Sequence, residues 1–220
     1  MGAVMVNQSV VRMSWLALLA VTMLTACAEV AAAVPETTTR PAGVDNELLA
    51  GHSHAAQANK LFEAGAQAFR QNHPDQAMHH WHEAALLGHE RAQYNLGSGY
   101  ASGTSLPRDF ERAAYWWRQA ALQGNTDALY NLGVLNYEGR GMERSVAKAK
   151  HWWRRAARQG DPASMFRLGW LAATGDGEIS DMAEARLWWE QSAHLGFAPA
   201  IKALEILNRD EGRSPASARR

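Results

Sequence analysis

Residues 145–160 read SVAKAKHWWRRAARQG, and this pattern of alanines, tryptophans and a final glycine recurs every 36 residues. Five columns of the pattern hold one residue type in four successive copies. These columns are Ala77, Ala113, Ala149 and Ala185; Trp81, Trp117, Trp153 and Trp189; Ala85, Ala121, Ala157 and Ala193; Gly88, Gly124, Gly160 and Gly196; and Leu96, Leu132, Leu168 and Leu204. A period of this length is typical of a solenoid, in which each repeat packs only on its neighbours.

Each copy of the pattern predicts two helices. In the third copy, the apolar spacing predicts a helix over residues 127–138, a glycine loop over 139–141 and a second helix over 145–159. Gly160 then suits the left-handed position that follows a helix end. Residues suited to N-cap positions stand at matching places, namely Asn125 and Asp161 before first helices and Asp109, Ser145 and Asp181 before second helices.

The tryptophans and leucines of the columns are the predicted core. The rings of a doublet such as Trp152-Trp153 point about 100° apart on a helix, so we expect one ring inside its own hairpin and the other on the next. Alanines beside them allow close helix approach. The predicted core consists of Trp81, Trp117, Trp153, Trp189, Leu96, Leu132 and Leu168.

The second copy carries a recognisable set of residues: Ala92, Leu96, Gly97, Tyr100, Gly103, Ala113, Trp116, Ala120, Ala121 and Gly124. This set resembles the Sel-one-like repeat (SLR), a relative of the tetratricopeptide repeat (TPR). The resemblance implies an all-α fold, a right-handed superhelical α/α solenoid of helix-turn-helix repeats. It predicts a TPR-like capping hairpin at 57–89, SLR repeats at 90–125, 126–161 and 162–197, and a C-terminal capping helix at 198–209.

The N-terminal segment predicts export. Residues 15–26 form a short apolar run, and Leu24-Thr25-Ala26-Cys27 resembles the bacterial lipobox. We therefore expect a signal peptide over 1–26 and lipidation of Cys27. Ala28 follows the cysteine, and by resemblance to enterobacterial lipoprotein sorting this implies an anchor in the outer membrane, with the protein facing the periplasm. An ordinary export signal with an incidental cysteine remains the alternative. Residues 27–56 are predicted as a flexible tether and 210–220 as a disordered tail.

Composition and motifs argue against catalysis and nucleic-acid binding. The 22 basic and 22 acidic residues balance, which gives no basic stripe for nucleic acid. No catalytic triad, phosphate-binding loop or dinucleotide fingerprint is present. His79 and His82 have the spacing of two helical metal ligands, but no carboxylate–histidine motif accompanies them, and a solvated helix face is the favoured interpretation. We predict no enzyme activity, no metal and no cofactor.

The resemblance to tetratricopeptides implies that the first helices line a concave face that binds a partner. The predicted contacts are Tyr94, Tyr130, Val134, Tyr137, Phe166 and Trp170. Tyr94, Tyr130 and Phe166 recur at the repeat period, so packing between repeats is an equal alternative for them. The favoured function is a non-catalytic scaffold that binds another envelope protein and reaches the membrane through its lipid. The alternative is a lipoprotein that binds peptidoglycan or another glycan.

Overall fold

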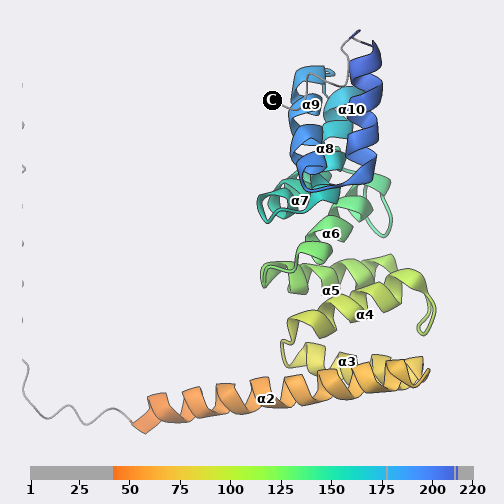
Figure 1. Cartoon of the computed structure of the whole chain (residues 1–220). Helices are drawn as coiled ribbons and strands as arrows, with labels where there is room; N and C mark the ends of the chain where they lie inside the picture. Colours follow the sequence, from red (N-terminus) through yellow and green to blue (C-terminus); the bar gives the residue numbers. More distant parts are fainter. Residues whose placement is uncertain (1–41, 177, 211, 213–220) are drawn as a thin grey trace, which may run out of the picture. The chain divides into compact units, whose positions relative to one another are not determined.

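The computed structural model of the chain describes residues 42–176, 178–210 and 212, with side chains from residue 53 onward. This part is helical and contains no strand. The helices are α2 (Ala42–Arg70), α3 (Pro74–Leu86), α4 (Glu90–Ser102), α5 (Phe110–Leu122), α6 (Thr126–Glu138), α7 (Val146–Arg158), α8 (Pro162–Thr174), α9 (Met182–His194) and α10 (Ala198–Asp210) (Figure 1). The predicted signal peptide, Cys27 and most of the predicted tail lie outside the described residues.

The chain divides into two compact units, Met1–Leu48 and Leu49–Arg220. The structure describes only residues 42–48 of the first unit. In the second unit, α4 pairs with α5, α6 with α7 and α8 with α9, and each pair contacts the helix before and after it in the chain. The fold is therefore an all-α solenoid of helical repeats, as the 36-residue period predicts.

The helices begin and end at the residues that the sequence pattern singles out. The Asp109, Ser145 and Asp161 side chains each accept a hydrogen bond from the backbone N–H three residues ahead. These caps satisfy amide groups that have no partner within the helix. Gly160 has a φ of +88°, the left-handed conformation that glycine adopts without strain.

A tryptophan of each second helix crosses a glycine of the preceding first helix. Trp153 is 1% exposed, and a Cβ placed on Gly133 would lie 2.2 Å from its Nε1. The same indole N–H donates to the Tyr130 carbonyl at 3.1 Å, one turn before Gly133. Only glycine leaves room for a flat ring this close to a helix backbone. The same crossing joins Gly65 to Trp81, Gly97 to Trp117 and Gly169 to Trp189.

The other ring of each doublet packs between repeats. Trp116 is buried in the cluster that contains Met78 and Trp81, and Trp152 packs on the cluster of Ala113 and Trp117. The expectation that this ring meets the next hairpin is thus wrong, because it meets the preceding one. The reason is geometric: the residue before the crossing tryptophan lies about 100° round the helix, on the side turned to the preceding hairpin.

Helix α2 extends further toward the N-terminus than the sequence pattern predicts. Residues 42–56 belong to the predicted tether, but the structure places them in the helix. The run Glu47-Leu48-Leu49-Ala50 consists of residues that favour helix. Among the described helices, none combines the length and apolarity needed to cross a membrane.

Candidate functional site

The three recurring aromatic residues of the predicted contact face lie half-buried between repeats. Tyr94 packs on the core cluster of α5 and α6, and Tyr130 packs on that of α7 and α8. Phe166 contacts Phe197 with ring centroids 5.8 Å apart. The backbone carbonyl of each of the three accepts the indole N–H of the crossing tryptophan. These residues therefore take part in repeat packing, the alternative that the recurrence left open.

Tyr137 and Trp170, which break the repeat pattern, lie together at the boundary between α6 and α8. Their rings meet edge to face, with centroids 5.7 Å apart. The Tyr137 hydroxyl donates to Asp176 Oδ2 at 2.8 Å, and the Arg144 guanidinium donates to the same oxygen at 2.6 Å. Arg144 also lies over the Tyr137 ring, 5.0 Å from its centroid. Both the hydroxyl and the ring of Tyr137 thus make contacts within the chain.

The charges of this cluster stabilise one another. Hydrogen bonds from Tyr137 and Arg144 lower the pKa of Asp176. Burial, followed by the hydrogen bond to Asp176, raises the pKa of Tyr137. The carboxylate and the neutral phenol are therefore the forms that the fold favours at neutral pH.

A second ion pair joins the same two repeats. Lys150 Nζ lies 2.7 Å from Glu178 Oε2, with the lysine side chain 10% exposed and the glutamate 66% exposed. The hydrogen bond from Lys150 lowers the pKa of Glu178. The sequence-based prediction contains neither this pair nor Arg144 and Asp176, because it places partner contacts at five aromatic residues and Val134. The available signal was a lysine in the column that holds Met78 and Ala114 in the earlier repeats.

Val134, the remaining predicted contact, lines a groove of about 310 Å³ between α4 and α6. We call this the first-helix groove; its other lining residues are Ser98, Ala101, Ser102, Phe110, Trp117, Asn131, Leu135, Glu138 and Arg140. Arg140 lies over the Phe110 ring at 5.5 Å and pairs with Glu138 at 2.9 Å. The groove combines an apolar floor with a polar, charged rim, the composition of surfaces that bind proteins.

His79 and His80, which come just before Trp81 in α3, contact Glu83 and each other. His79 lies 3.6 Å from Glu83, while the His79 and His80 rings contact each other at 5.8 Å. Across the described residues, no three His, Cys, Asp or Glu side chains are grouped so that they could hold a metal ion. His89 has a structural role, because its Nδ1 accepts from the Ala92 N–H at the start of α4. Burial and the nearby Arg91 lower the pKa of His89, which favours the neutral ring that this bond requires.

Comparisons with known proteins agree with the observed repeats. The family model described as Sel1 repeat matches residues 55–89, 90–125, 126–161 and 162–197, so its first match covers the whole of the segment 57–89 that the sequence pattern predicts as a TPR-like cap. A protective antigen of uropathogenic Escherichia coli with an SLR fold is 32% identical, with a TM-score of 0.66 over 74% of this chain and 36% of that one. A Sel1 repeat protein from Oxalobacter formigenes is 28% identical, with a TM-score of 0.62 over 66% of this chain and 61% of that one. The chain thus spans between about a third and three fifths of these proteins. No curated protein sequence gives a significant match.

Proposed function

The chain belongs to the Sel1 repeat family, and we propose on this premise that it is a scaffold of the bacterial cell envelope that binds another envelope protein. Sel1 repeats are generally protein–protein interaction modules, and the family is of a non-catalytic kind. The observation that carries the proposal is the first-helix groove. Its floor is apolar, and its rim presents Asn131 and Ser102 beside the Arg140–Glu138 pair.

The proposed location depends on the N-terminal sequence. Leu24-Thr25-Ala26-Cys27 resembles a lipobox, and we propose that Cys27 carries the lipid that anchors the scaffold to the outer membrane, facing the periplasm. Metabolic labelling with a fatty-acid analogue tests this directly. Wild type should be labelled and Cys27→Ser should not. Equal labelling of both would place the lipid elsewhere.

The binding face is tested by variants that spare the core. Tyr137 and Trp170 pack within the chain, so replacing them would also disturb the fold. Asn131→Arg combined with Ser102→Arg instead places two long side chains at the first-helix groove, and neither residue belongs to a buried cluster. Affinity capture from native envelopes, with quantitative mass spectrometry, should recover a protein with wild type that this variant loses. Recovery of an identical set of proteins with wild type and variant would refute the first-helix groove as the binding site.

The glycan-binding alternative receives no support from the Tyr137 ring. Stacking on a sugar requires an aromatic ring with a free face. The Tyr137 ring is instead covered by Arg144 and contacts both Trp153 and Trp170. Sedimentation of the purified chain with sacculi distinguishes the two functions, since the scaffold should remain in the supernatant.

A further inference from the structure

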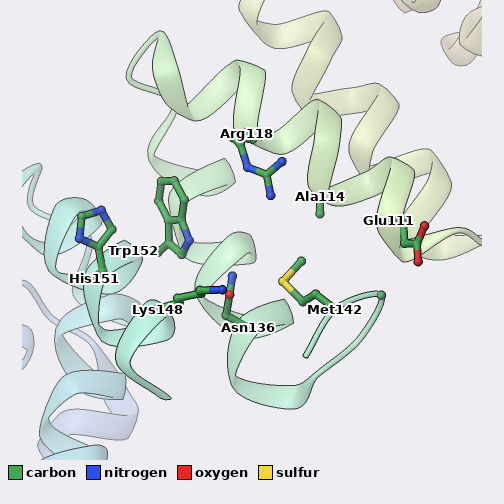
Figure 2. A pocket seen from close by; sticks show the side chains of 9 residues that line it. Glu111, Ala114, Arg118, Asn136, Met142, Lys148, His151 and Trp152 are labelled. Atoms are coloured by element: carbon green, nitrogen blue, oxygen red, sulfur yellow. The ribbon is translucent and has the colours of Figure 1, made fainter. Parts of the chain in front are cut away.

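A larger groove, of about 610 Å³, lies between the second helices α5 and α7 (Figure 2). We call it the second-helix groove. Ala114 and Asn136 lie in its floor, and both are nearly completely buried. Met142 enters from the loop that follows α6, and Trp152 closes one end. No residue of the first-helix groove lines it, so the two surfaces are separate.

The groove exists because two residues of this repeat boundary are smaller than their counterparts one repeat earlier. Ala114 stands in the column of Met78, and Asn136 stands in the column of Tyr100. At the earlier boundary, Met78 is buried and both Tyr100 and Leu106 pack against its cluster. One repeat later, the same column holds Lys150, which bonds to Glu178. The second-helix groove is therefore a local departure from a filled boundary.

Two exposed cationic side chains border the groove. Arg118 and Lys148 reach toward it from α5 and α7 (Figure 2). Within the part of the chain that the structure describes, neither forms a hydrogen bond or ion pair through its side chain. His151 lies beside Trp152, with ring centroids 5.3 Å apart. The acidic lining residue, Glu111, lies at the end away from Trp152 (Figure 2).

The floor offers complementary chemistry. Ala114, the Met142 side chain and the Trp152 indole provide an apolar wall next to the two cations. The Asn136 amide donates to the Leu132 carbonyl at 2.8 Å, and no described residue donates to its side-chain oxygen. That oxygen can accept a backbone N–H from a bound chain. The wide exposure of the rim suits a chain segment better than a small molecule, which binding pockets usually enclose.

We propose that the second-helix groove binds an extended segment of a partner protein in which an acidic side chain neighbours an aliphatic one. The carboxylate lies between Arg118 and Lys148, where charge-assisted hydrogen bonds are strong. The aliphatic side chain packs on Ala114, Met142 and Trp152. This binding site is additional to the one proposed at the first-helix groove, and either of the two proposals can be refuted without refuting the other.

The test uses a random dodecapeptide library displayed on phage and the full chain purified in detergent. Selection on wild type, with subtraction on Ala114→Met/Asn136→Tyr, isolates peptides that need the open groove. The subtracting variant carries the residues of the filled boundary, and circular dichroism and thermal unfolding verify that it folds. Enriched peptides should combine Asp or Glu with Leu, Ile or Val.

The most enriched peptide is then synthesised with a fluorescent label and titrated by anisotropy. Arg118→Gln and Lys148→Gln should each weaken its binding about tenfold or more, because each removes a charge-assisted hydrogen bond. The matched control is Arg154→Gln, which changes the equivalent exposed residue one repeat later and should leave the dissociation constant within about twofold of wild type.

Three results would overturn the proposal: no peptide enriched over the filled variant, enriched peptides without acidic residues, or binding that persists in Arg118→Gln/Lys148→Gln. Loss of peptide binding in the Asn131→Arg/Ser102→Arg variant, with the second-helix variants unaffected, would assign the peptide to the first-helix groove. That result would also refute the second-helix site while supporting the proposed function.

Discussion

Replacing Gly133 by alanine should destabilise the solenoid, although alanine is the better helix former. In the middle of a helix, the exchange alone favours folding by about 1 kcal/mol. Here the new Cβ would stand 2.2 Å from Trp153 Nε1 and 2.4 Å from Cδ1, so the indole must move. Overpacking of this kind costs about 1–3 kcal/mol, and loss of the bond to the Tyr130 carbonyl costs about 1 kcal/mol more. The net expectation is a loss of about 1–3 kcal/mol.

A matched glycine exchange isolates the role of the rigid ring. A Cβ on Gly99 would also lie 2.2 Å from its nearest neighbour, but that neighbour is the terminal methyl of Met78. A methionine end can rotate away, whereas an indole fixed by packing cannot. Gly99→Ala should therefore be neutral or stabilising by up to about 1 kcal/mol, despite the same separation.

Urea denaturation followed by far-ultraviolet circular dichroism measures both variants. Because repeat proteins can unfold in stages, intrinsic tryptophan fluorescence should be recorded in parallel to test for a single transition. Near the thermal midpoint, Gly133→Ala should lower Tm by about 2–12 °C, given about 2–4 °C per kcal/mol for a domain of this size. Equal midpoints for Gly133→Ala and Gly99→Ala would refute the argument that the tryptophan crossing dictates the glycine.

Three further changes probe the contacts between and within repeats. Asp176→Asn should lower the urea midpoint at neutral pH. Because the pKa of Asp176 is lowered in the folded state, the difference from wild type is present above the ordinary aspartate pKa and disappears as the pH falls through the lowered pKa. A difference that does not change with pH would contradict this. Lys150→Met should keep nearly wild-type stability, because methionine fills the same column at Met78. Lys150→Ala should instead cost about 1–3 kcal/mol in the same denaturation assay. Equal losses in the two variants would show that the charge of Lys150 matters more than its packing. Asn125→Ala should cost about 1–2 kcal/mol, because the Asn125 side chain accepts from the Ala128 N–H at 2.7 Å, which caps α6, and donates to Glu90 at 2.5 Å. An unchanged thermal midpoint would refute this capping role.

The elements that repeat could be predicted from the sequence because each is a local consequence of residue type. Ser145 and Asp181 cap helices through contacts within three residues, and Gly160 follows a helix end through its own backbone. The Trp153 column needed only the period, since a ring recurring in every copy belongs to the core. The caps and the glycine depend on little beyond the nearest turn of helix.

The second-helix groove could not be predicted in this way, because it depends on which columns meet across a boundary. Ala114 is unremarkable as an alanine on a helix. That its small side chain opens a groove becomes clear only in the structure, where Ala114 occupies the place of Met78 and Lys150 in other repeats and faces Met142. Tyr137 shows the converse: a residue that breaks the pattern suggested a partner contact, and the structure shows it bonded to Asp176 in the next repeat.

The column of Met78, Ala114 and Lys150 also makes the copies non-interchangeable, despite their common shape. Deleting residues 126–161 would preserve the helical register, yet it would bring Ala114 opposite Glu178 and leave that carboxylate without its lysine. Swapping two repeats would misplace these pairs in the same manner. The order of the repeats is thus encoded in the side chains that meet at each junction between two repeats.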